Sequence, residues 1–327
     1  MLRALRRLGR RDLSEYQHNR AQAHGAHATP QGQGPVRPAP VTQGKRKRSG
    51  GVWRVVFVVS LIVFLCAAGA LAFIGYGYWH GQQNNKQLEQ IGFNAPDASE
   101  LQRTDLASFT VDWDALRAIN PDVVGWIYVP GTTVNFPIVH GTDDEHYLKT
   151  DFYGQTSWVS FGSIFLSAAN AGDFSDANNI VYGHHMNDGS MFSPFADFGD
   201  ADTFNGHRIV YVFTPTANYQ LTTFSIVHCA ADDPLAQTAF AGEQERQAYV
   251  QDKVDRSVVT VAGLPSAADM KHTFAFSTCD NLASNGRWVL FAYESGSTAA
   301  ASAVADDSSI NPEDVAAVSE AAKETAA

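Results

Sequence analysis

The chain has 327 residues, 45% of them hydrophobic, so it is long enough to build at least one domain with its own core. Residues 1–54 carry 12 Lys/Arg and two acidic residues, whereas the remainder carries 11 basic and 32 acidic residues, for a formal net charge of −11 overall. A basic head before an acidic body indicates two compartments rather than one nucleic-acid-binding protein, and three cysteines are too few for a disulfide framework.

The head, residues 1–54, is rich in Arg, Gln, Gly and Pro and lacks hydrophobic periodicity, so we expect a disordered segment. It closes on the cluster Lys45-Arg46-Lys47-Arg48. Beside a membrane span, such a cluster faces the cytoplasm and its anionic lipids.

The next segment predicts a transmembrane helix over residues 55–79. Residues 55–78 form an uncharged, mostly apolar run that would span roughly 36 Å as a helix, enough for a bilayer core of about 30 Å. Trp53 and Trp79 flank it, as aromatic belts do. A cleaved signal peptide is the alternative, but the apolar run is longer than a usual signal core. The charge bias places the N-terminus in the cytoplasm and the body outside, in a single pass.

We expect residues 80–111 to be a linker, residues 112–294 to form the folded domain and residues 295–327 to be an acidic, Ala-rich disordered tail. The folded segment contains short runs of β-branched and aromatic residues separated by turn residues. These runs predict eight strands: 126–129, 134–139, 163–166, 179–182, 209–213, 219–227, 273–277 and 288–293. So many short strands in one domain favour a closed, mainly β barrel.

Three helices are also predicted within the folded domain. Asp112–Ile119 has helical spacing and opens the domain. Ser190 is a candidate cap for a helix over 191–198. A longer helix is predicted over 243–254, with Ala248, Val250 and Val254 on one side.

Three residues at strand ends have matching chemistry. His184 follows an apolar strand, Cys279 ends another, and Arg287 begins the strand after it. A thiolate is a nucleophile, an imidazole exchanges its proton near neutral pH, and a guanidinium stabilises an oxyanion. Singly, each residue is more often structural: a small buried Cys, a solvated loop His, an Arg at a strand edge. Together they indicate acyl transfer through a thioester.

The motifs around these residues resemble the sortase family, specifically class B. They are Tyr182-Gly183-His184, Asp188-Gly189-Ser190-Met191-Phe192, Ser277-Thr278-Cys279 and Arg287-Trp288-Val289. Trp126-Ile127, Pro130-Gly131-Thr132, Tyr147-Leu148 and Gly162-Ser163-Ile164-Phe165-Leu166 add to the match in the right order. The resemblance covers roughly residues 112–294.

The resemblance implies an eight-stranded sortase barrel and a membrane-anchored cysteine transpeptidase of a Gram-positive envelope. Such an enzyme cleaves the C-terminal sorting signal of secreted proteins and transfers the acyl group to a cell-wall or pilin amine. The resemblance also implies that His184, rather than His185, is catalytic, together with Cys279 and Arg287. Ser277, Thr278 and Asp280 are weaker candidates for substrate binding or support, a solvated loop acid being the commoner reading of Asp280. Ala275-Phe276 departs from the family's usual Thr-Leu, which bears on substrate preference.

Other readings of the same residues stay open. Water instead of an amine acceptor would make the enzyme a hydrolytic cysteine peptidase, and loss of catalysis would leave a membrane-tethered binding module. A Cys229–Cys279 bridge would consume the nucleophile. We expect neither a cofactor nor a metal ion, because the adjacent histidines point in different directions and no CxxC or HExxH spacing is present.

Overall fold

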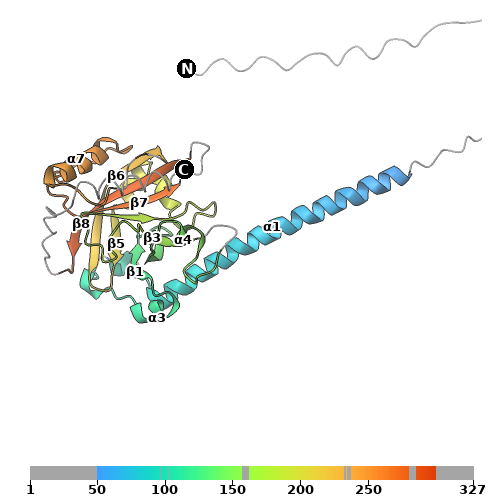
Figure 1. Ribbon diagram of the computed structural model, residues 1–327, viewed down its shortest axis with the longest axis horizontal. Helices are drawn as coiled ribbons and strands as arrows, with labels where there is room; N and C mark the ends of the chain where they lie inside the picture. The colour runs from blue at the N-terminus through green and yellow to red at the C-terminus, as the bar shows by residue number, and fades with distance from the viewer. Residues whose placement is uncertain are drawn as a thin grey trace, which may run out of the picture. The chain divides into compact units, whose positions relative to one another are not determined.

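Eight strands form a closed barrel in the order β1-β2-β3-β4-β7-β8-β6-β5 (Figure 1). This computed structural model describes residues 50–96, 98–101, 103–156, 162–231, 233, 237–279 and 285–299. The predicted basic head before residue 50, the predicted tail from residue 300 and Asp280 lie outside the described residues. The eight-stranded barrel predicted from the sequence is confirmed.

Every predicted strand has a counterpart in the barrel. The strands are β1 Val123–Tyr128, β2 Asn135–His140, β3 Ile164–Leu166, β4 Asn178–Tyr182, β5 Ile209–Phe213, β6 Asn218–Ala230, β7 Thr273–Cys279 and β8 Gly286–Ser297. β-Branched and aromatic residues dominate them, because such side chains pack well on a pleated surface. The longest strands, β6 and β8, exceed the predicted bounds at both ends.

Two strand pairs are parallel, and one of them determines where the site lies. β2 pairs with β3 and β4 pairs with β7 in parallel, whereas the other neighbours are antiparallel. In the β4–β7 pair, Tyr182 lies opposite Ser277. Parallel strands run in the same direction, so the C-terminal ends of β4 and β7 meet at one edge of the barrel.

Alternation along β7 separates the barrel interior from its outer face. Phe274 and Phe276 are fully buried in the interior cluster, together with Leu290 of β8. Ala275, which points to the opposite face, belongs to a second cluster outside the barrel. Full burial of each large apolar side chain contributes about 1.5–3 kcal/mol, so this alternation fixes the register of β7. Cys279 shares the outward face with Ala275, because it lies four residues further along.

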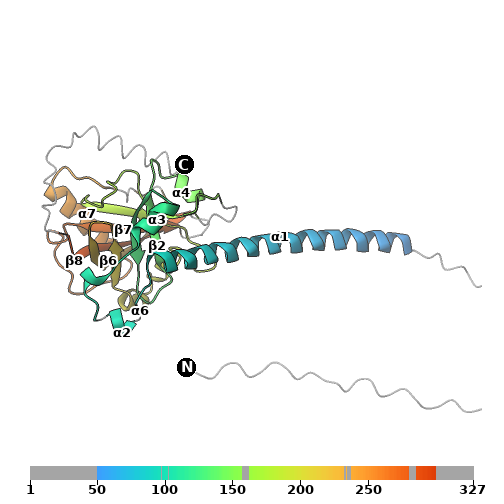
Figure 2. The same ribbon diagram turned by 90° about the horizontal axis from the view of Figure 1, so that it is seen from below.

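In the described part of the chain, the helices are α1 Gly50–Gly92, α2 Ala98–Leu101, α3 Trp113–Ile119, α4 His146–Lys149, α5 Pro194–Asp197, α6 Ala201–Gly206 and α7 Glu243–Asp255, and Leu106–Ser108 forms a 3₁₀ turn, η1. The predicted helix at 112–119 is confirmed as α3, whose cap Asp112 accepts from the N–H of Ala115 at 2.9 Å. Figure 2 shows α3 on the side of the barrel, where it contacts β1.

The helix predicted over 191–198 is wrong in its extent. Met191 has a positive φ of 57° and forms a bridge with His185, so no helix begins there. Only Pro194–Asp197 is helical, starting after Ser193 with Pro194 in its first turn. Ser190 is therefore not its cap.

The helix predicted over 243–254 is confirmed as α7, which lies on one side of the barrel beside β6 (Figures 1 and 2). Its predicted apolar face is right for Val250 and Val254, which pack inward, and wrong for Ala248, which is exposed. The buried residues also include Arg246 and Lys253, each 3% exposed. The Arg246 guanidinium donates to the carbonyl of Met270 at 2.6 Å, so hydrogen bonds compensate for burying its charge.

α1 is a single helix of 43 residues. Among the residues that the structure describes, it alone is long and apolar enough to cross a membrane, with a mean hydropathy of 2.8 in its most apolar stretch. It ends at Gly92, beyond the predicted end of the span at residue 79. Near its C-terminal end Leu88 is 2% exposed, and the following Phe93 packs on Phe213 of β5 at 4.9 Å between ring centroids.

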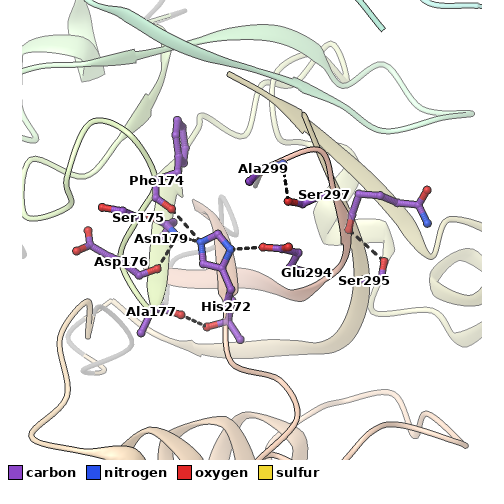
Figure 3. A network of polar contacts seen from close by, with 12 residues as sticks. Phe174, Ser175, Asp176, Ala177, Asn179, His272, Glu294, Ser295, Ser297 and Ala299 are labelled. Carbon is purple, nitrogen blue, oxygen red and sulfur yellow. Dashed lines mark hydrogen bonds and ion pairs between the residues drawn. The ribbon is translucent and has the colours of Figure 1, made fainter. Parts of the chain in front are cut away.

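A polar network joins β7, β8 and the β3–β4 connection (Figure 3). His272, just before β7, donates from Nδ1 to Glu294 of β8 at 2.6 Å. Its Nε2 lies 2.9 Å from the carbonyl oxygen of Phe174 and 2.9 Å from the amide nitrogen of Asn179. Three chain segments are therefore joined through one imidazole.

Candidate active site

The predicted nucleophile and the predicted cation face each other across neighbouring strands. Cys279, the last residue of β7, lies opposite Arg287 of β8, and Arg287 lies opposite Cys229 of β6 on its other side. Residues directly opposite in adjacent strands project to the same face of the sheet. The three side chains therefore form one row across the outer face of the barrel.

The same face is covered by α7 further along the strands. Val289 and Phe291, which share the face of Arg287, pack in one cluster with Tyr249 and Val250 of α7. Cys279 and Arg287 are only partly buried. The row thus lies beyond the part of this face that α7 covers.

His184 reaches this row through the parallel pairing of β4 and β7. The N–H of Gly183 donates to the carbonyl of Ser277 at 3.0 Å, which continues the ladder by one residue past Tyr182. The same register sets His184 level with Cys279. The neighbouring ring of His185 donates from Nδ1 to the backbone carbonyl of Cys279 at 2.9 Å and ties the two segments together.

The ring of His184 is held by a backbone acceptor. Its Nε2–H donates to the carbonyl of Leu148 in α4 at 2.7 Å, so in the neutral imidazole the lone pair lies on Nδ1. Desolvation by burial lowers the pKa of His184, and the hydrogen bond to Leu148 partly opposes that shift. A Cβ on Gly162 would lie 2.8 Å from Nε2, so only glycine leaves room for this ring position.

Arg287 is oriented by its own turn. Its Nη1 donates to the carbonyl of Gly286 at 3.1 Å and to the backbone and side-chain oxygens of Asn285 at 3.3 Å. Asn285 has a positive φ of 52°, a conformation that Asn tolerates better than most residues. The guanidinium is thereby fixed at the start of β8.

Cys229 differs from Cys279 in its place and its environment. Arg287 separates the two cysteines, and two interstrand spacings of about 4.8 Å exceed the Cα separation of about 7 Å that a disulfide allows. All three cysteines are free thiols. The suggested Cys229–Cys279 bridge is therefore wrong. Burial, with a smaller effect of Asp233, raises the pKa of Cys229 to about 11.

The weaker candidates divide between the two faces. Ser277 is 8% exposed and points to the face of Cys279, two residues away. Thr278 points into the barrel, where its hydroxyl is buried without a hydrogen-bond partner among the described residues. The position of Asp280 falls outside the described residues.

Two contributors to the site were missed by reasoning about reactive side chains: the carbonyl of Leu148 and the empty Cβ position of Gly162. Both lie in motifs that matched the family pattern, which was the one available signal. Within the described ranges, no three His, Cys, Asp or Glu side chains are grouped to hold a metal ion. His184 and His185 bind different carbonyls rather than a common centre.

Comparison with known proteins identifies the family. No family model matches the chain. Sortase B of Staphylococcus aureus is 30% identical over 169 residues, which are 52% of this chain and 68% of that protein. The chain belongs to the sortase B family. Sortase B of Listeria monocytogenes is 28% identical over 222 residues, covering 66% of this chain and 87% of the relative.

Solved sortase B structures share this barrel. The Staphylococcus aureus sortase B–substrate complex superposes with a TM-score of 0.55 at 26% identity, covering 66% of this chain and 97% of that chain. Membership of the sortase B family makes this protein a cysteine transpeptidase. The sortase-type barrel predicted from the sequence is therefore the fold of this chain.

Proposed function

We propose that Cys279 is the nucleophile, His184 the proton-transfer residue and Arg287 the oxyanion-stabilising cation of this transpeptidase. The observation that carries the proposal is the single row in which β4, β7 and β8 bring the three residues to one edge of the barrel. Ser277, on the same face, and Thr278 and Asp280, beside the nucleophile, are proposed as supporting residues.

The proposed reaction has two acyl transfers. The thiolate of Cys279 attacks a peptide carbonyl carbon, and the Arg287 guanidinium stabilises the resulting oxyanion. The C–N bond breaks, the imidazolium of His184 gives its proton to the leaving amine, and the acyl group remains as a thioester on sulfur. An acceptor amine then attacks the thioester, its proton passes to the imidazole, and the thiolate leaves.

The hydrogen bond from His184 to Leu148 selects the atom that moves the proton. Because Nε2 is engaged with a carbonyl, which only accepts, Nδ1 is the nitrogen that exchanges a proton with the reactants. Burial lowers the pKa of this ring, so the imidazolium readily releases its proton to a leaving amine.

The proposed substrates are secreted proteins that carry a C-terminal sorting signal, with a cell-wall precursor or pilin amine as the acceptor. We place the enzyme in the membrane through one span at residues 55–79, with the head at 1–54 in the cytoplasm and the catalytic domain at 112–294 outside. The lysine and arginine excess before the span supports this orientation. A Gram-positive bacterium is the proposed setting, as for the two curated relatives.

The proposal is tested with the full-length protein in detergent, fully reduced, incubated with a set of sorting-signal peptides and triglycine as the amine. Mass spectrometry follows the thioester on Cys279 and the amide product. A thioester that is converted to a triglycine adduct supports the proposal, and Cys279→Ala is the matched control. Hydrolysed peptide alone, at every amine concentration, would instead assign a peptidase. A thioester at Cys229, or none with any peptide, would overturn the assignment.

A further inference from the structure

The C-terminal end of α1 contacts both segments that hold His184. We name the ten residues Gly183–Phe192 the histidine loop, since they carry the imidazole. The second segment is α4 with the chain that follows it, and the Leu148 carbonyl in α4 accepts the Nε2–H of His184. α1 takes no part in the strand pairing that brings His184 to Cys279, so its contacts call for a separate explanation.

The first contact is with the turn of the histidine loop. Gln82 donates from Nε2 to Oδ2 of Asp188 at 3.0 Å. The other carboxylate oxygen of Asp188 accepts from the backbone N–H and the hydroxyl of Ser190, at 3.0 and 2.6 Å. Asp188 therefore orders the turn with one oxygen and joins it to α1 with the other. One turn further along the helix, Asn85 lies 4.0 Å from the sulfur of Met191.

The second contact is with the chain that follows α4. Asn84 donates from Nδ2 to Oδ2 of Asp151 at 3.5 Å. Asp151 itself accepts from the backbone N–H groups of Tyr153 and Gln155, at 3.0 and 2.8 Å, and so fixes the bend after α4. The hydroxyl of Tyr153 reaches Gln87 of the helix at 3.5 Å. The acceptor of the His184 hydrogen bond is thus joined to the same helix.

The end of α1 is itself firmly packed. Leu88 is buried, and a Cβ on Gly92 would lie 2.6 Å from the ring of Trp126, so the helix approaches β1 as closely as a glycine permits. Residues 81, 84, 85, 88 and 92 are spaced to lie on one side of a helix. That side packs against the barrel, with Leu88 buried and Gly92 close to Trp126.

We propose that residues 81–88 of α1 brace the catalytic imidazole, with Gln82 and Asn84 as positioning residues that act through the histidine loop and the chain after α4. This inference rests on the proposed role of His184. Because α1 is one uninterrupted helix from its apolar stretch to Gly92, the brace is continuous with the segment proposed to cross the membrane.

The test measures how His184 affects the thiol, and it needs no peptide substrate. The full-length chain, in phosphatidylglycerol–phosphatidylcholine vesicles, is alkylated with iodoacetamide from pH 5 to 9. Peptide mass spectrometry gives the rate at Cys279 separately from the other two cysteines. An imidazolium next to a thiol favours the reactive thiolate, so the rate near neutral pH reports the pairing of the two side chains.

Four variants are compared with the wild type. The double variant Gln82→Ala/Asn84→Ala removes the hydrogen bonds to Asp188 and Asp151. Gln82→Lys keeps a hydrogen-bond donor for Asp188. Gln83→Ala makes the same chemical change at an exposed neighbouring position. His184→Ala defines the rate without the imidazole. Thermal unfolding is recorded for each variant, so that loss of fold is seen independently.

We expect the double variant to alkylate roughly threefold to tenfold more slowly at pH 7, the range that a lost hydrogen bond allows, with its pH profile displaced toward that of His184→Ala. Gln82→Lys and Gln83→Ala should stay within about twofold of the wild type on the same scale. If the double variant folds and keeps the wild-type pH profile while His184→Ala changes it, the bracing role of α1 is disproved and the proposed role of His184 stands. An unchanged profile in His184→Ala overturns the proposed role of His184 and the brace with it.

Discussion

The Nε2–H of His184 donates to the carbonyl oxygen of Leu148 at 2.7 Å, although 36 positions separate the two residues. A backbone carbonyl is a fixed acceptor, because no side-chain rotamer can withdraw it. This bond fixes the tautomer of the ring and leaves Nδ1 for the proposed proton transfer. The position of the His184 ring therefore depends on the backbone of α4 and on Gly162, which lies against the ring.

Gly162→Ala should displace this ring. The new Cβ would lie 2.8 Å from Nε2 and 2.6 Å from the carbonyl oxygen of Tyr147, so the imidazole or α4 must shift. We expect kcat/KM to fall roughly 10- to 100-fold, as small misplacements of catalytic groups do. The measurement is steady-state transpeptidation of a sorting-signal peptide.

Gly154→Ala is the matched control. Gly154 also has a positive φ, 74°, but open space surrounds its Cβ position, so the substitution adds similar backbone strain without touching the ring. Equal losses of activity in the two variants would show that strain, and not the ring position, explains the effect.

Arg287→Ala should leave the barrel folded and lower kcat roughly 100- to 1,000-fold, the usual effect of removing one oxyanion-stabilising donor. The side chain is partly exposed and its hydrogen bonds are to its own turn, so little of the core depends on it. Arg287→Lys should recover only part of the activity, because a lysine lacks the planar fork. Burst kinetics would show whether thioester formation is the slowed step.

A matched substitution for this series is Arg117→Ala, which removes an exposed arginine from α3. The Arg117→Ala variant is expected to keep the wild-type kcat. If Arg287→Ala unfolds the barrel at the assay temperature, Arg287 has a structural role instead.

Cys229 should behave as a spectator thiol. Cys229→Ala is expected to retain kcat within about twofold, because Arg287 on β8 lies between Cys229 on β6 and the proposed nucleophile on β7. Because its pKa is raised to about 11, very little thiolate forms at pH 8, and iodoacetamide should alkylate Cys229 more slowly than Cys279. Peptide mass spectrometry after mild peroxide treatment should find no intramolecular Cys229–Cys279 bridge. Detection of that bridge in folded protein would contradict the strand order.

Stability in acid should depend on Glu294 (Figure 3). The hydrogen bond from His272 holds the pKa of Glu294 below its ordinary value of 4.5 in the folded protein. A carboxylate with a lowered folded pKa contributes stability that is fully present above its unfolded pKa and is lost as pH falls through the folded pKa. Asp173 and Asp176 lie on the segment before β4 that packs near this pair, and burial raises the pKa of the neighbouring Tyr219 above its ordinary value.

Glu294→Gln should therefore lower the Tm at pH 7 and flatten its dependence on pH below about 4.5. Differential scanning calorimetry from pH 7 to 3 checks both effects. Glu145→Gln, at an exposed position before α4, is the control and should follow the wild-type curve. A Glu294→Gln curve that coincides with that of the wild type would mean that the His272–Glu294 hydrogen bond contributes nothing to stability.

The strands were predictable from the sequence because alternation and β-branched residues determine them locally, as in β7. The buried side of α7 was not, because Arg246 and Lys253 pack inward through hydrogen bonds and a ring contact that hydrophobic periodicity does not encode. The local turn at Met191 likewise replaced a helix that spacing alone favoured.

The candidate site likewise has parts that the sequence predicts and parts that only the fold determines. Reactive side chains such as Cys279 and Arg287 could be found from residue type and from motifs at strand ends. The Leu148 carbonyl could not, because any residue offers a carbonyl and only the folded chain selects one. Gly162 appeared in a matching motif, but its role depends on the His184 ring, which follows two further strands, β3 and β4.

The parallel pairing of β4 with β7 also affects when this enzyme becomes competent. His185 and the carbonyl that it binds on Cys279 are 94 positions apart, and β7 enters the barrel only between β4 and β8. Pairings of such long sequence separation form late, because loop-closure entropy opposes them until most of the chain is present. A nascent chain that has synthesised β4 but not β7 and β8 therefore has the proposed catalytic histidine without the proposed nucleophile. We expect acyl transfer only after the last strand has closed the barrel.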